Sequence, residues 1–303
     1  AAPLPGTVVV RFDHQTGLFD QAYLLEDAHA QESTVLDRVL DDLVANDLVI
    51  ADRHFCIVHF LLQLAAHSGF FVIRQHGRLK GKLQGKRKRV GKIDSGTVYE
   101  QALEISDGEQ TQVLRRITVE LIEPTRDGDT EIHVLSNVPI NDADACILSQ
   151  LYRDRWEIEN AFYVLATTLN CETPSNCYPR CALFQFCMAM FAYNCRQVLL
   201  AALYAEHEQE DVEAMSQYQV ALDIVSPMEG MLTAITDEEW ATLTPQRADS
   251  IATFLRRVSQ HVDISSYRKS VRGPKKPPPK RKRCKAGTHV STHRLLEKRK
   301  QTC

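Results

Sequence analysis

The chain has 303 residues, of which 44% are hydrophobic and 25% are charged, and its formal net charge is −3. This ordinary globular composition excludes a fully disordered, collagen-like or fibrous chain. The longest mostly apolar run, Cys181 to Tyr193, is shorter than the roughly 20 residues of a membrane helix. The first residues also lack the features of a signal peptide, so we expect no membrane partner. Nine cysteines without regular spacing indicate reduced thiols and a cytoplasmic protein.

The charge is distributed unevenly along the chain. Residues 268–303 contain 14 Lys and Arg residues and one acid, Glu297, and the basic run 74–92 contains no acid. Two basic segments on an otherwise acidic chain favour a polyanion as partner. Solvated surface loops and a disordered tail would give the same pattern, so charge alone leaves both interpretations open.

The N-terminal part of the sequence predicts a mixture of strands and helices. Residues 7–12 and 18–25 are strand-like and flank a turn, which predicts a β-hairpin. Residues 29–44 carry apolar side chains at helical spacing. The apolar run 47–51 is typical of a strand that is buried on both faces.

The pattern changes twice in the rest of the chain. A helix is expected over 54–66 and a buried strand over 70–74, followed by the strand-like and turn-rich stretch 75–137. From 141 onward the spacing is helical as far as 267. The last 36 residues are rich in Pro, Lys and Arg and cannot form a packed core.

Two acids stand out by their placement. Asp52 follows a predicted buried strand, at the sheet edge where α/β proteins present functional groups. Glu159 lies on a predicted helix with Arg155 four residues and Tyr152 seven residues earlier, so the three share one helix face. Spacing alone favours simpler interpretations: an exposed Arg–Glu pair beside a Tyr, and an Asp that caps the helix beginning near His54.

Two motifs resemble the DDE transposases of bacterial insertion sequences, in particular their YREK group, the insertion-sequence-four family. Residues 50–55 (IADRHF) resemble the motif of the second aspartate, and residues 151–159 (LYRDRWEIE) resemble the Tyr-x2-Arg-x3-Glu signature. The same family is indicated by four further segments: Leu4–Gly6, Glu26–Glu32, Phe71–His76 and Leu135–Pro139. The resemblance covers about residues 1–205.

The resemblance implies a ribonuclease-H-like α/β catalytic domain with a β-rich insertion between the second Asp and the Glu. Five parts are then expected along the chain: 1–74 and 138–205 as the two parts of the catalytic domain, 75–137 as the insertion, 206–267 as a C-terminal helical region and 268–303 as a disordered basic tail.

The resemblance also implies three carboxylates that bind two Mg²⁺ or Mn²⁺ ions for an in-line phosphoryl displacement. Asp52 would be the second catalytic, metal-binding carboxylate and Glu159 the third. Tyr152 and Arg155 would contact phosphates of the transposon ends, since the Arg fork pairs bidentately with phosphate. Further DNA contacts are expected from these basic residues: Arg53, Lys86, Arg87, Lys88, Arg89, Lys280, Arg281, Lys282 and Arg283.

The sequence departs from the family pattern at two places. Ala166 stands where the signature ends in Lys, so any phosphate contact of that Lys is absent or supplied elsewhere. In the family the first catalytic Asp lies on a strand before the segment Leu4–Gly6, so we expect a chain that lacks its N-terminal part and its first Asp. Asp13 is a weak substitute because it matches a turn position.

Two functions remain open at this point. The first is a truncated DDE transposase that cleaves and joins double-stranded DNA, both transposon ends and target. The alternative is a catalytically dead, DNA-binding remnant of one. The resemblance further implies a homodimer on paired ends in the bacterial cytoplasm, associated with the nucleoid.

Overall fold

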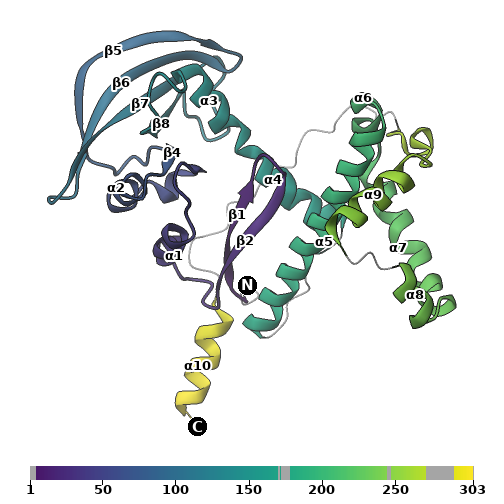
Figure 1. Cartoon of the computed structure of the whole chain (residues 1–303). Coiled ribbons are helices and arrows are strands. Elements are labelled where there is room, and N and C mark those ends of the chain that lie inside the picture. Colours follow the sequence, from purple (N-terminus) through teal and green to yellow (C-terminus); the bar gives the residue numbers. More distant parts are fainter. Residues whose placement is uncertain (1–4, 170, 172–177, 244–246, 271–289, 303) are drawn as a thin grey trace. The chain divides into compact units, whose positions relative to one another are not determined.

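The computed structural model describes residues 5–169, 171, 178–243, 247–270 and 290–302. The chain forms two compact units, one made of Ala30–Glu159 and the other of Ala1–His29 together with Asn160–Cys303 (Figure 1). Both helices and strands occur, and the larger of two sheets is mixed, which confirms the α/β class expected from the sequence.

A six-stranded sheet forms the centre of the unit Ala30–Glu159. Its strands, in spatial order, are β3 (Leu48–Ala51), β4 (Phe70–Arg74), β8 (Glu131–Ser136), β7 (Thr111–Leu121), β6 (Gly96–Ser106) and β5 (Lys82–Ile93). Only β3 and β4 run parallel, and the long strands β5 to β7 curve together in Figure 1. The strands of the expected insertion thus continue the sheet of β3 and β4, and the boundaries proposed near 75 and 137 stay a prediction.

The helices of this unit are shorter than the sequence pattern predicts. They are the 3₁₀ turn η1 (Glu32–Val35), α1 (Leu36–Asp41), the 3₁₀ turn η2 (Arg53–Phe55), α2 (Val58–Ala66) and α3 (Ala145–Asp154). The helix expected over 29–44 ends early because Asp47 accepts the N–H of Val44 at 2.9 Å and Asn46 adopts a φ of 72°. A left-handed residue cannot continue a helix, and it turns the chain into β3.

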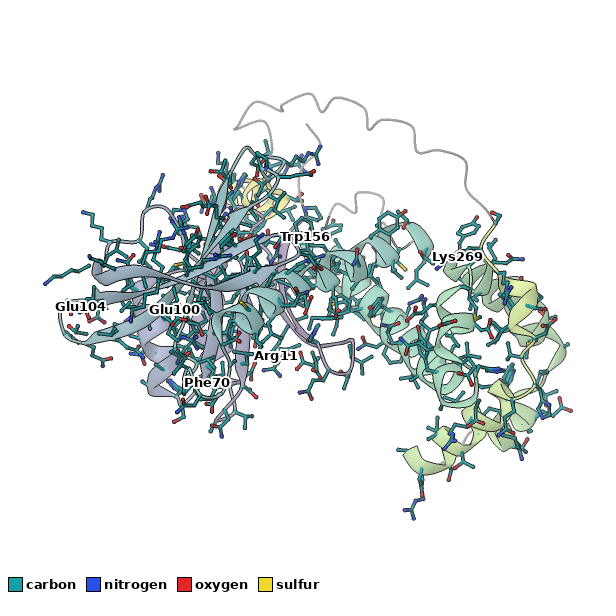
Figure 2. The ribbon with its side chains drawn as sticks, turned by 90° about the horizontal axis from the view of Figure 1, so that it is seen from above. Arg11, Phe70, Glu100, Glu104, Trp156 and Lys269 are labelled. Carbon is teal, nitrogen blue, oxygen red and sulfur yellow. The ribbon has the colours of Figure 1, made fainter. Side chains whose placement is uncertain are left out.

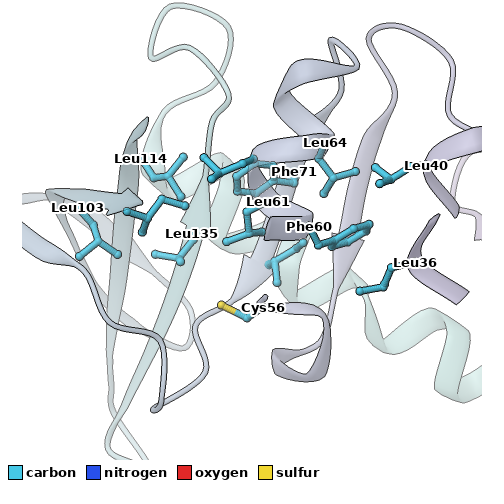
Figure 3. Close-up of a cluster of buried hydrophobic side chains, with 13 residues drawn as sticks. Leu36, Leu40, Cys56, Phe60, Leu61, Leu64, Phe71, Leu103, Leu114 and Leu135 are labelled. Atoms are coloured by element: carbon cyan, nitrogen blue, oxygen red, sulfur yellow. The ribbon is translucent and has the colours of Figure 1, made fainter. Parts of the chain in front are cut away.

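Two apolar clusters hold helices on opposite faces of this sheet. On one face, α2 places Phe60 and Leu61 against Phe71 of β4 (Figure 3). On the other face, Leu148 of α3 packs against Val72, the next residue of β4. Because successive side chains of a strand point to opposite faces, β4 is buried on both, as its apolar sequence predicted.

The other unit contains the predicted hairpin, β1 (Thr7–Asp13) and β2 (Leu18–Leu25), which pairs antiparallel. The hairpin packs on α5 (Pro179–Glu206), where Asn194 both accepts the N–H of Phe19 at 3.0 Å and donates to its carbonyl at 2.7 Å. The remaining elements are α4 (Trp156–Tyr163), which crosses from one unit into the other, the π-helix η3 (Val164–Thr168), α6 (Gln209–Glu213), α7 (Gln217–Ala234), α8 (Asp237–Leu243), α9 (Ala248–Ser259) and the 3₁₀ turn η4 (Ile264–Tyr267).

Helix α5 is apolar around most of its circumference. Within the described parts of the chain, it is the one helix whose length and composition would allow it to cross a membrane. A core helix of a soluble protein has the same properties, and 39% of its most apolar window is buried. Tyr193 of this helix packs at 5.1 Å between ring centroids against Phe19 of the hairpin.

The structure describes two parts of the segment 268–303, namely 268–270 and 290–302, and the expectation of a disordered tail stays a prediction. Arg268 forms an ion pair of 2.9 Å with Asp211, and residues Thr292–Thr302 form helix α10. Arg294 of α10 donates to Asp27 at 2.8 Å. The negative partners, Asp211 and Asp27, are distant in sequence, so composition alone cannot predict these ion pairs. Lys280, Arg281, Lys282 and Arg283 lie outside the described residues.

The contact between α10 and Asp27 has a predictable pH range. Desolvation raises the pKa of Asp27, but hydrogen bonds from the N–H of His29 and from Arg294 outweigh it and lower this pKa from 3.8 to about 2. The contribution of Asp27 is therefore complete above pH 3.8 and is lost as the pH falls through 2. We expect a ¹³C NMR titration of the Asp27 carboxyl to give a midpoint near 2, moving upward when Arg294 is replaced by Gln. A midpoint near 4 in the unchanged protein would contradict the contact.

Candidate active site

Asp52 lies directly after β3, at the carboxyl end of the strand. Its carboxylate accepts the N–H of Arg53 through Oδ1 and thereby caps the short turn η2. The side chain is only partly buried. The capping role that the spacing favoured is therefore present in the structure. A capping carboxylate that still reaches solvent can also bind a cation. Arg53 itself is exposed next to this carboxylate.

Arg74 lies beside Asp52 because β3 and β4 are parallel and in register. Ala51 pairs with Ile73, so the next residues of the two strands are Asp52 and Arg74. The guanidinium of Arg74 donates to Asp129 at 2.7 Å. Sequence reasoning assigned Arg74 only to a basic run. The rule that parallel strands end at the same sheet edge could have identified it.

Tyr152 connects this edge to helix α3. Burial raises the pKa of the Tyr152 hydroxyl, the positive charges of Arg155 and Arg74 lower it, and the negative charge of Asp52 raises it. Contacts place the ring in the same region: it packs in one cluster with Val72 of β4 and Ile50 of β3, and the guanidinium carbon of Arg155 lies 5.8 Å from its centroid. The structure thus brings Tyr152 and Arg155 to the ends of β3 and β4, although Asp52 precedes them by about 100 positions in the sequence.

Arg155 occupies the short break between α3 and α4. Its guanidinium donates to Glu159 at 3.0 Å, so the predicted i,i+4 pair on one helix face is present. The Arg155 side chain is 18% exposed, and its Nε is buried without a hydrogen-bond partner among the described residues. A buried donor without an acceptor is costly and points to an absent acceptor such as a phosphate oxygen.

Trp156 is a further candidate that the motif search did not single out. It is 59% exposed at the start of α4, where Figure 2 labels it, and its ring lies 5.6 Å from the guanidinium carbon of Arg155. Exposed aromatic rings beside cations are typical of surfaces on which nucleic-acid bases stack. The signal in the sequence was a large apolar residue on the polar side of the helix.

The basic run 86–89 lies on β5, the edge strand opposite β3, and contains two kinds of residue. Arg87 forms an ion pair of 2.8 Å with Glu131 and lies 4.0 Å from the ring centroid of Tyr99. Its hydrogen bond is the main reason that the pKa of Glu131 is lowered. The neighbouring Lys86, Lys88 and Arg89 are exposed. They are free for a polyanion, and they also protect an edge strand from pairing.

A buried ion pair supports the site from the side of the long strands. Arg115 of β7 donates twice to Glu100 of β6, at 2.8 and 3.0 Å, and both side chains are mostly buried (14% and 18% exposed). Figure 2 labels Glu100 on the sheet. Arg115 also donates to the carbonyls of Val138 and Ala143 at 2.9 and 2.7 Å. It therefore fixes the loop that leads into α3.

Metal binding was tested against the groups present. Among the residues that the structure describes, no three His, Cys, Asp or Glu side chains converge on one point. Asp52 and Glu159 both belong to the unit Ala30–Glu159 and both reach solvent, and their oxygens are the hard ligands that Mg²⁺ prefers. The donor type fits, and the set of three carboxylates is incomplete.

Asp52 and Arg74 lie at the ends of neighbouring strands, and Tyr152 and Arg155 lie on α3 and directly after it. Such a group of arginines beside a carboxylate is typical of a protein that handles an anionic substrate. A family model described as a transposase DDE domain matches residues 7–195. The match spans more than half of the chain, so the chain belongs to the transposase DDE domain family. Comparison with curated proteins found no match. The family agrees with the resemblance found in the sequence, and transposition is an activity on DNA.

Proposed function

We propose that this chain is a transposase of the YREK group with a ribonuclease-H-like fold, and that it cleaves and joins DNA at transposon ends. The observation that carries the proposal is the convergence of Asp52, Arg74, Tyr152 and Arg155 at one edge of the sheet, with Glu159 bound to Arg155. The residues come from three parts of the fold, β3, β4 and the segment of α3 and α4.

Asp52 and Glu159 would hold divalent metal ions, Mg²⁺ or Mn²⁺. When bound, such ions lower the pKa of a nucleophilic water or 3′-OH and stabilise the leaving oxygen. Arg155 is the group that orients the phosphate, because its planar fork offers parallel donors and its Nε already lacks an acceptor. Tyr152 of α3, buried in the cluster around Val72, would limit where the phosphate can lie.

The remaining carboxylate, the first Asp of the family pattern, would come from a strand that pairs with the free edge of β3. This strand ends the six-stranded order and has a neighbour on one side only among the described strands. An unpaired edge offers backbone N–H and C=O groups to an added strand. Asp13 remains a weak candidate for this group, because it lies in the hairpin turn, where it accepts the N–H of Gln15 at 2.9 Å and the hydroxyl of Thr16 at 2.7 Å.

The partner would be double-stranded DNA, bound by a homodimer of this chain on paired transposon ends in the bacterial cytoplasm. Exposed Lys86, Lys88 and Arg89 on β5 and exposed Arg53 beside the site supply positive charge for the phosphate backbone. Arg87 stays a candidate DNA contact, although its guanidinium is already engaged by Glu131.

The difference between the exposed lysines of β5 and the ion-paired Arg87 provides a test of DNA binding. Replacing Lys86 and Lys88 together by Gln is expected to reduce the slope of log affinity against log salt by about two, since two phosphate contacts are removed. Fluorescence anisotropy with a duplex at several salt concentrations measures this slope. Arg87→Gln is the matched comparison. It is expected to lower the melting temperature and to change the salt slope less than the Lys86/Lys88 double variant does. An unchanged slope in the Lys86/Lys88 double variant would exclude β5 from the DNA interface.

The test of the proposed function itself is nicking of supercoiled DNA by the purified chain with Mg²⁺ or Mn²⁺. A nick that requires the metal and is lost in Glu159→Gln supports a transposase. Binding without any nick would leave only the DNA-binding function.

A further inference from the structure

Asp129 contacts the sheet edge described above from a part of the chain that the motifs do not include. It lies in the loop between β7 and β8, and its Oδ2 accepts a hydrogen bond from Arg74 at 2.7 Å. The Arg74 side chain is 23% exposed, so this ion pair is partly removed from water. The bond crosses from a loop near the long strands to the end of β4, beside Asp52.

The loop holds Asp129 in a defined place. Its N–H donates to the hydroxyl of Thr125 at 3.0 Å, and its carbonyl accepts the N–H of Thr125 at 2.8 Å. Gly128 closes the turn with a φ of 93°, a conformation that favours glycine. An acid fixed by its own backbone in this way can hold a long, flexible arginine in one orientation.

Besides Asp129, the carboxylate of Asp52 stands at the end of the strand next to β4, one position beyond the Ala51–Ile73 pair. A pair between Arg74 and Asp52 would neutralise a proposed metal ligand, and an unrestrained Arg74 would lose its orientation toward a phosphate. We propose that Asp129 is a positioning residue, which holds the Arg74 guanidinium at the Asp52 edge and keeps it from pairing with Asp52. The proposal rests on the proposed function of that edge.

A simple surface ion pair is the competing interpretation, because Asp129 is 44% exposed and such pairs contribute little. The two interpretations differ in what happens to the reaction and to the orientation of Arg74. Removing the negative charge of Asp129 makes the surface more attractive to a polyanion under either interpretation. Under the positioning role the orientation of Arg74 and the nicking are lost as well, whereas a simple surface pair leaves nicking unchanged.

Asp129→Asn in the full chain tests the proposal, with Asp127→Asn as the matched control. Asp127 is exposed in the same loop and carries the same charge, and no ion pair of it is described. For Asp129→Asn we expect duplex affinity at low salt to rise about twofold to threefold. We expect Mn²⁺-dependent nicking at saturating duplex to fall about tenfold. Asp129→Glu should restore most of the nicking, and Asp127→Asn should change nicking less than twofold.

A second measurement follows Arg74 directly and does not depend on activity. The Arg74 side-chain N–H signal, assigned by its loss in Arg74→Gln, should be sharp and protected in the unchanged chain and broadened in Asp129→Asn only. Unchanged nicking, a signal equally sharp in Asp129→Asn, or equal falls in affinity and thermal stability would each overturn the proposal. If the unchanged chain makes no nick, the proposed function fails, and the Arg74 signal still decides the role of Asp129.

Discussion

Glu159→Gln is expected to abolish metal-dependent nicking of DNA, with a loss of more than about a hundredfold, while duplex affinity changes less than about threefold. Substitution of outer-shell partners of a metal ligand alone costs 10-fold to 100-fold in affinity or activity, and loss of a ligand costs more. The residue is exposed on α4 and makes one side-chain bond, to Arg155, so its loss should leave the fold intact.

The control for this prediction is Glu157→Gln on the same helix, which is exposed and removes the same charge. Asp52→Asn should reduce nicking as much as Glu159→Gln does. The fold should be preserved, because Asn retains an oxygen acceptor that can cap η2. The measurement is a time course of supercoiled plasmid conversion with Mg²⁺ and with Mn²⁺, beside anisotropy with a duplex. Nicking that survives in either site variant would exclude these carboxylates as metal ligands.

Arg115→Ala is expected to destabilise the unit Ala30–Glu159 by about 3–5 kcal/mol, because it leaves the mostly buried Glu100 charge without a partner. The carbonyls of Val138 and Ala143 lose the same donor. Urea unfolding followed by tryptophan fluorescence measures the change, since Trp156 begins the helix that follows α3.

Two comparisons make the Arg115 result specific. Arg126→Ala, an exposed arginine in the loop between β7 and β8, should change the free energy of unfolding by less than about 0.5 kcal/mol. The double variant Arg115→Met with Glu100→Leu removes both charges and should recover much of the loss. A cost below about 1 kcal/mol for Arg115→Ala would show that the pair does not anchor the loop before α3.

The sequence by itself determined the local elements and the family. Strand β4 could be predicted because five apolar residues in a row suit burial on both faces, and the clusters around Phe71 and Val72 confirm it. The hairpin followed from two strand-like segments around a turn. Spacing placed Arg155 and Glu159 on one helix face, where they form their ion pair. These features depend on neighbours within about one or two helical turns, so periodicity reveals them.

Partners distant in sequence were decided only by the tertiary structure. Arg74 reaches the site because β3 and β4 pair in register, and Asp129 binds it across 55 positions. Arg87 looked like its basic neighbours until Glu131 was found beside it. The C-terminal helix α10 looked disordered by composition, yet Asp27 binds its Arg294. The sequence gives the number of charged side chains and where they are dense along the chain. Which of them form ion pairs depends on which strands and loops the fold brings within a few ångströms of one another.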